Sequence, residues 1–181
     1  GDLPTTTLPA TTVPSATDPS TAGPTSDGFA ELTCRFTGTS TLATPLSMDD
    51  RFPAAPNEMT LEPGAAFDCT DADEASAGTI ELTAAFESLS ALRGVGAGQG
   101  RIRWTELPAE RRPTDGLAAE STTGVEVELQ VPVIVVWTTI LDGPYAGYRG
   151  RLVLQDWEPI FGEGGITAVR FAPTSTTFRP G

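Results

Sequence analysis

The side chains that could do chemistry in this chain are mainly carboxylates, because histidine and lysine are both absent. The 181 residues include 24 acidic side chains and 11 basic ones, all of them arginine, which gives a formal net charge of -13. Without histidine there is no imidazole base, no Ser-His or Cys-His nucleophile and no histidine metal ligand. Without lysine there is no side-chain Schiff base. A polyanion also repels phosphates, so we expect no nucleic-acid partner.

Paired carboxylates are the one catalytic device that this composition leaves open. Glycosidases need two carboxyl groups a few ångströms apart, one of them with its pKa raised by burial. Glu106 lies two residues after Trp104, and Asp156 and Glu158 flank Trp157, so an aromatic ring could stack on a sugar beside each of them. The tryptophans are explained more simply as core or strand-face aromatics. We therefore expect a non-enzyme without a cofactor, and we keep a carboxylate-based glycan hydrolase as an alternative.

The densest acidic cluster is the run from Phe67 to Glu74. Within it, Asp71, Asp73 and Glu74 supply carboxylate oxygens at close spacing, and oxygen is the ligand that calcium takes. The glycine and the distal glutamate of an EF-hand loop are missing, so a solvated acidic turn is the simpler interpretation. We predict no metal site, with these three residues as the calcium alternative.

A turn rich in glycine and tyrosine, residues 142–148, joins the two strongest predicted strands. Tyrosines on loops are good binding anchors, because they offer a large rigid contact area at a low cost in conformational entropy. Tyr145 and Tyr148, together with Trp157 at the end of the following strand, are therefore the candidate binding residues. The alternative interpretation is that both tyrosines are ordinary hairpin residues.

From Gly28 onward the apolar residues alternate with a period of two, which is typical of strands with one buried face. The segments that predict strands are Phe29–Phe36, Thr79–Phe86, Gly100–Thr105, Gly124–Leu141, Tyr148–Trp157 and Gly165–Phe171. Pro132 cannot donate to a sheet ladder, so it implies an edge, a bulge or a break in the long fourth segment. Glu81–Arg93 also fits helical spacing, and we expect the run Gly94–Gly100 to be a hairpin or bulge connection. The sum is about seven to nine short strands, which predicts an all-β antiparallel sandwich or barrel.

Composition divides the chain into a tail, residues 1–27, and a β domain, residues 28–181. The tail contains eight Thr, three Ser and five Pro but no aromatic or basic residue, so it cannot bury enough apolar surface to fold. Its prolines recur every five residues from Pro4 to Pro24, which predicts an extended, polyproline-like segment. Such composition is typical of O-glycosylated stalks, and an unmodified disordered leader is the alternative.

Cys34 and Cys69 are the two cysteines, and they suit one disulfide formed in an oxidising compartment. The alternative is a pair of reduced core cysteines, and their spacing is not that of a zinc site. No segment approaches the roughly 18 consecutive apolar residues that a transmembrane helix needs. We therefore expect a secreted or cell-surface protein, and a lipid anchor upstream of Gly1 would be compatible with this location.

Three short motifs point to a known group of proteins. Gly98–Trp104 contains a GxGxIxW pattern, Gly143–Gly150 contains a G-x-[FY]-A-G turn, and Cys34 precedes the TGT sequence Thr37–Thr39. Together they resemble small exported β-rich proteins of actinobacteria, over about residues 30–172. The resemblance implies export and a β-fold rather than an activity. The abundance of Ala, Gly, Pro and Arg, with no lysine, also agrees with a GC-rich genome.

Three functional hypotheses follow from these observations. The leading one is a non-catalytic, exported β domain displayed on a Thr/Pro stalk, which binds or presents at the cell surface with a protein or glycan as partner. The second is a structural subunit of an extracellular assembly or filament, in which the N-terminal extension adds a strand to an exposed sheet edge of another copy. The third is the carboxylate-based hydrolase.

Overall fold

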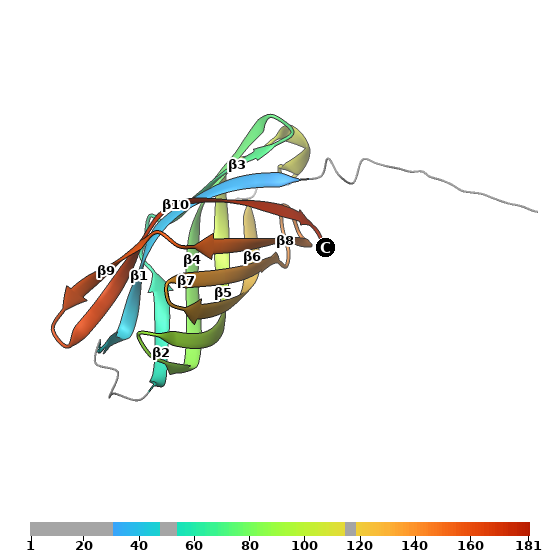
Figure 1. Cartoon of the computed structure of the whole chain (residues 1–181). Helices are drawn as coiled ribbons and strands as arrows, with labels where there is room; N and C mark the ends of the chain where they lie inside the picture. The colour runs from blue at the N-terminus through green and yellow to red at the C-terminus, as the bar shows by residue number, and fades with distance from the viewer. Residues whose placement is uncertain (1–30, 48–53, 115–118) are drawn as a thin grey trace, which may run out of the picture. The chain divides into compact units, whose positions relative to one another are not determined.

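A single antiparallel sheet contains all the strands in the computed structural model, which describes residues 31–47, 54–114 and 119–181 (Figure 1). This result confirms the predicted all-β antiparallel class. The expected tail, residues 1–27, lies outside the described residues. The helical structure in the described ranges is the short 3-10 helix Ala109–Arg111. Within these ranges no helix has the length and apolar character needed to cross a bilayer.

The strands follow one another as an up-and-down meander. Their bounds are β1 (Leu32–Leu46), β2 (Ala55–Leu61), β3 (Ala66–Asp71), β4 (Glu74–Leu89), β5 (Arg93–Glu106), β6 (Glu120–Gln130), β7 (Val133–Ile140), β8 (Tyr148–Leu154), β9 (Trp157–Gly162) and β10 (Gly165–Pro180). β2 and β3 lie end to end, since both pair with β1 on one side and with β4 on the other. β8 and β9 pair with opposite ends of β10 in the same manner.

The sheet closes on itself because its first and last long strands pair. β1 and β10 are antiparallel neighbours over most of their length, from Leu32 opposite Phe178 to Thr41 opposite Ala168. They lie side by side in Figure 1, in blue and red. Of the two predicted forms, this closure corresponds to the barrel, in which alternate side chains of every strand point inward.

Inward-facing apolar side chains fill the barrel, as the period of two predicts. The buried hydrophobic members on β1, β4, β6 and β8 are Leu32, Cys34, Phe36, Ile80, Ala84, Phe86, Leu89, Val125, Val127, Leu129, Tyr148, Leu152 and Leu154. The inner face of the fourth predicted segment ends at Leu129, and Val131 is 41% exposed, because the chain turns at Val131 and Pro132. The break predicted at Pro132 is therefore confirmed.

The glycine-rich run Gly94–Gly100 belongs to strand β5, so the prediction of a connection there is wrong. The inward positions of this run are glycines because β4 occupies the space that side chains would fill. A Cβ atom on Gly98 would overlap the carbonyl oxygen of Thr83, and one on Gly96 would lie 2.8 Å from the ring of Phe86. β4 and β5 can approach this closely only where the inward positions of β5 carry no side chain.

The structure also differs from two other interpretations that were based on periodicity. The helical alternative for Glu81–Arg93 is wrong, since β4 continues as a strand to Leu89 and pairs with both β2 and β5. β10 extends well beyond the predicted end at Phe171. A register shift between Ile166 and Ala168 breaks its strict alternation. Side chains of both parities are consequently buried on this strand, namely Ile166, Ala168, Val169 and Phe171.

Candidate functional site

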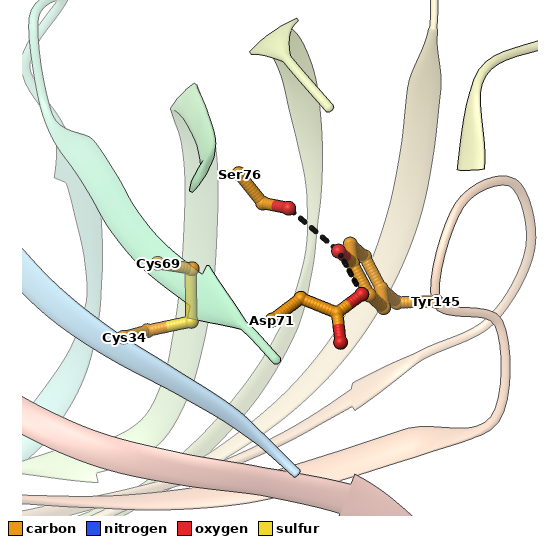
Figure 2. Close-up of a disulfide and its surroundings, with 5 residues drawn as sticks. All are labelled: Cys34, Cys69, Asp71, Ser76 and Tyr145. Atoms are coloured by element: carbon orange, nitrogen blue, oxygen red, sulfur yellow. Dashed lines mark hydrogen bonds between the residues drawn. A yellow bond between two sulfur atoms is a disulfide. The ribbon is translucent and has the colours of Figure 1, made fainter. Parts of the chain in front are cut away.

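The predicted disulfide between Cys34 and Cys69 is confirmed. The two residues face each other directly across β1 and β3, with their Cα atoms 4.0 Å apart. Both are buried inside the barrel, so the bond joins neighbouring strands from within. Asp71, two residues after Cys69, continues toward one end of the barrel on the same strand (Figure 2).

That end of the barrel is closed by five polar or aromatic side chains, which we call the polar cluster: Asp71, Ser76, Arg111, Tyr145 and Tyr148. Tyr145 Oη donates a hydrogen bond of 2.9 Å to Asp71 Oδ2 (Figure 2). Because the single hydroxyl proton of Tyr145 is used in this bond, Ser76 Oγ is the donor in the 2.6 Å bond to Tyr145 Oη. Ser76 and Tyr145 are 0% and 2% exposed, so both bonds are shielded from water. The cluster connects β3, β4 and the β7–β8 turn.

Arg111, from the 3-10 helix, covers this cluster. Its Nε lies 3.4 Å from Asp71 Oδ2, and its Nη2 donates a 2.9 Å hydrogen bond to Tyr148 Oη. The guanidinium carbon also lies 4.5 Å from the centroid of the Tyr145 ring, which is a cation–π distance. The negative charge of Asp71 is therefore balanced by Arg111, and the side chains of the polar cluster bind one another.

The β7–β8 turn is folded inward by a second set of hydrogen bonds. Trp104 Nε1 donates to Ser121 Oγ at 2.9 Å, and Ser121 Oγ donates to the carbonyl of Pro144 at 2.7 Å. Tyr145 itself has a φ of +64°, in the left-handed region that non-glycine residues seldom adopt. The carboxylate of Asp142 accepts a 2.8 Å bond from a backbone N–H, and this bond lowers the pKa of Asp142.

Burial raises the pKa of Tyr145 well above its usual range, and the hydrogen bond from Ser76 only partly opposes that effect. The phenol is therefore protonated at physiological pH and donates its proton to Asp71. These contacts indicate a structural role for the polar cluster, which closes this end of the barrel.

The structure places the three sequence-predicted binding residues away from a free loop surface. Tyr145 and Tyr148 are only 2% and 7% exposed, so in this structure they close the barrel end instead of presenting their rings to a partner. Trp157 is half-buried, and its Nε1 donates a 2.9 Å hydrogen bond to the carbonyl of Pro132. The hairpin interpretation of the two tyrosines is the one that their burial supports.

The acidic side chains of the calcium alternative do not converge. Asp71 is directed at Tyr145 and Arg111, whereas Asp73 and Glu74 are exposed at the β3–β4 turn. Among residues 31–47, 54–114 and 119–181, no group of three or more potential ligands is arranged to hold a metal ion.

The carboxylates of the hydrolase alternative are also distributed over the barrel. Glu106 ends β5 near the polar cluster, whereas Asp156 follows β8 at the opposite end, so these two groups do not flank one position. Glu158, on β9, is exposed and forms a 2.7 Å ion pair with Arg170.

A different aromatic residue, Trp137 on β7, is presented to solvent with 40% of its surface exposed. It lies directly opposite Glu126 of β6 on one side and Arg151 of β8 on the other. Glu128 and Arg149 occupy the adjacent rows of the same outer surface. We call these five side chains the Trp137 face.

A groove of about 580 Å³ runs over this surface, with Val95, Glu126, Glu128, Trp137 and Arg149 among its lining residues. The four charged side chains of the Trp137 face form no salt bridge with any residue that the structure describes. They differ in this respect from Arg101 and Arg103 nearby, which both pair with Glu120. Their hydrogen-bonding capacity is available to a ligand.

The sequence alone did not single out Trp137, because the run from Val133 to Trp137 is apolar on both faces and hides the parity of the strand. Comparisons with protein-family models, curated proteins and solved structures found no match. What the chain binds is therefore inferred from its own surface chemistry.

Proposed function

We propose that this chain is a non-catalytic, exported binding domain that holds a neutral glycan on the Trp137 face. The supporting observation is a groove in which an exposed tryptophan lies near the carboxylates of Glu126 and Glu128 and the guanidinium of Arg149, none of which has an ion-pair partner among the described residues. The fold supplies a rigid platform, since all five side chains project from hydrogen-bonded strands of a closed sheet.

The residue types match the two sides of a sugar ring. The flat, apolar face of an indole packs against the C–H face of a pyranose, and burial of that contact is favourable. The carboxylates of Glu126 and Glu128 accept hydrogen bonds from sugar hydroxyls, and the guanidinium of Arg149 donates to their oxygens. Because hydroxyls both donate and accept, a groove that carries charges of both signs suits a neutral ligand.

The dimensions favour a glycan over a protein partner. A stable protein interface buries about 800 Å² on each side and has a centre depleted in charged residues. The Trp137 face has one aromatic residue among four charged ones, which is the opposite composition. The groove volume of about 580 Å³ falls within the range of roughly 300–1,000 Å³ that small-ligand sites occupy.

The positions of the groove carboxylates support binding without hydrolysis. A glycosidase needs one carboxyl group kept protonated by a desolvated environment and a second that is ionised. Glu126 and Glu128 are both exposed on the same face of the same strand, so neither has a desolvated environment. The groove is therefore assigned to recognition.

Export and display on a stalk are part of the same proposal. A disulfide such as Cys34–Cys69 persists in oxidising compartments, which supports a secreted or surface location. The Thr/Pro composition of residues 1–27 supports an extended spacer that would hold the binding face away from the cell.

The assembly hypothesis has less support from the described strands. β9 pairs with β10 and presents its other edge, but Pro159 lies at the middle of that strand. The backbone N–H of Ala172 donates to the carbonyl of Asp156, so the backbone groups of Asp156 face β10. Because these groups alternate in direction along a strand, the nitrogen of Pro159 faces the free edge, where it offers no N–H. Addition of a strand at this edge would lack a central hydrogen bond.

An array of neutral oligosaccharides tests the proposal, with the full chain and the variant Trp137→Ala as probes. Loss of a stacking contact worth about 1–2 kcal/mol predicts binding weaker by roughly 5- to 30-fold. Phe161→Ala is the matched control, because Phe161 is also an exposed aromatic residue, at 62%, but lies on β9. Absence of binding to every neutral sugar, or equal binding by both variants, would contradict the proposal, and release of shortened sugars would favour the hydrolase.

A further inference from the structure

A second groove lies beside the groove of the Trp137 face, on the outer surface of β4, β5 and β6. Its volume is about 540 Å³, and its lining residues include Glu87, Arg93, Val95, Glu128 and Gln130. Val95 and Glu128 also line the groove of the Trp137 face, so the two grooves meet at these residues. Together they extend from Arg149 on β8 to Glu87 on β4.

The pairing of the strands orders the residues along this combined groove. Trp137 lies on β7, and the neighbouring strand β6 carries Glu128. Val95 of β5 lies opposite Glu128, and Arg93 lies opposite Gln130 at the adjacent outward positions of the same two strands. A ligand that extends from Trp137 across the strands therefore meets a carboxylate, then a valine, and then an arginine beside an amide.

The side chains of the second groove are open to solvent, so a ligand can reach them directly. Val95 is 67% exposed, and its methyl groups offer an apolar contact to the C–H face of a sugar ring. Glu87, Arg93 and Gln130 are also exposed. Neither Glu87 nor Arg93 forms an ion pair with any residue that the structure describes. Their charged groups and the amide of Gln130 can therefore bond to the hydroxyls of a ligand.

We infer that the glycan site takes a linear, neutral oligosaccharide of about three or more sugar rings, which stacks on Trp137 and continues across the strands into the second groove. This inference rests on the proposed glycan site and adds the length and direction of its ligand. β4, β5, β6 and β7 are consecutive neighbours in the sheet, so β7 and β4 are about 14 Å apart. A pyranose ring is about as long as one strand spacing, so a single ring cannot fill both grooves. Glu87 and Arg93 again provide charges of both signs, which suits neutral hydroxyls.

Isothermal titration calorimetry of the full chain with sugars of two lengths tests the inference. The probes are cellobiose and cellopentaose, maltose and maltopentaose, and mannobiose and mannopentaose. In a series that binds, the pentasaccharide should bind at least about 10-fold more tightly than the disaccharide, because it forms additional hydrogen bonds in the second groove. The double variant Arg93→Ala/Gln130→Ala should weaken pentasaccharide binding by about 5- to 10-fold and leave disaccharide binding unchanged.

The matched control is the double variant Gln99→Ala/Arg101→Ala. Gln99 and Arg101 are also exposed residues of β5, but they line neither groove. This variant should bind both sugar lengths as the unmodified chain does. NMR spectra provide an independent readout: the disaccharide should shift the indole N–H signal of Trp137, and the pentasaccharide should also shift the side-chain amide signals of Gln130.

Equal affinities for the two sugar lengths, or equal losses in the two double variants, would overturn the inference and limit the glycan site to the Trp137 face. If the Arg93→Ala/Gln130→Ala variant does not fold, the comparison of the two lengths and the Gln130 signals of the unmodified chain still decide the question. Absence of binding by every probe would overturn the inference together with the proposed glycan site. Failure of the second groove alone and failure of the whole site are therefore distinguishable.

Discussion

The replacement Tyr145→Phe tests whether the polar cluster holds the closed end of the barrel together. The change removes one hydroxyl oxygen and leaves the ring, its packing against Trp104 and its contact with Arg111 in place. It removes the 2.9 Å bond to Asp71 and the 2.6 Å bond from Ser76. Ser76, at 0% exposure, has no access to water as a replacement partner.

The expected loss of stability can be assembled from these two bonds. A hydrogen bond to a charged acceptor contributes about 1.5–3 kcal/mol, and one between neutral groups about 0.5–1.5 kcal/mol. Asp71 keeps Arg111 at 3.4 Å, which offsets part of the first loss. We therefore expect the free energy of unfolding to fall by about 2–4 kcal/mol, and Tm to fall by roughly 5–10 °C.

Urea unfolding with the disulfide intact measures this quantity, and Tyr148→Phe is the matched control. Tyr148 loses a single 2.9 Å bond from Arg111, whose side chain is 32% exposed and can bind water instead. Its removal should cost less than about 1 kcal/mol. A cost below about 0.5 kcal/mol for Tyr145→Phe, or a larger cost for Tyr148→Phe, would refute the role assigned to the cluster.

Three further predictions concern the barrel itself. Gly98→Ala should lower the free energy of unfolding by more than about 2 kcal/mol in the same urea assay, because its Cβ would lie 2.7 Å from the Cα of Ala84. Gly124→Ala is the control: its Cβ would meet only a side-chain carbon at 3.8 Å, so this change should be neutral or stabilising by about 0.5 kcal/mol. Equal losses of stability in Gly98→Ala and Gly124→Ala would contradict the explanation given for the β5 glycines. Replacing both disulfide cysteines by alanine opens a link across 35 residues and should cost about 3–4 kcal/mol in chemical unfolding, whereas no change would show that the bond is dispensable. Burial raises the pKa of Tyr145 above that of an unfolded tyrosine, so the contribution of this phenol to the free energy of unfolding is complete below about pH 10 and is lost as the pH rises further. An ultraviolet titration should therefore find the phenol of Tyr145 still protonated at a pH where an exposed tyrosine has ionised.

The parts of the fold that could be predicted from the sequence are the strands in which apolar and polar residues alternate strictly. Val125, Val127 and Leu129 alternate with charged residues, so the inner face of β6 was readable, and Pro132 marked the turn that follows it. The pairing of β1 with β10 was not readable, because local periodicity carries no information on which distant strands become neighbours.

The errors have specific physical causes. Glycine disfavours strands in general, so Gly94–Gly100 resembled a connection, although β4 requires glycine there for close approach. Tyr145 looked like an exposed loop residue because its inward orientation depends on bonds from segments far away in the chain, to Asp71 and Ser76. Trp137 was hidden by a run that is apolar on both faces. In each case the decisive neighbour is a tertiary contact.

The central claim is that the Trp137 face recognises a neutral glycan. Its most direct test is an NMR titration with a neutral oligosaccharide, in which the indole N–H signals are followed. The three tryptophans give three separate reporters. Trp104 and Trp157 already donate hydrogen bonds within the protein, to Ser121 Oγ and to the carbonyl of Pro132. We predict that the signal of Trp137 shifts in a saturable way while the other two remain in place. A shift confined to Trp104 or Trp157, or no shift of any indole signal with a sugar that binds, would contradict recognition at the Trp137 face.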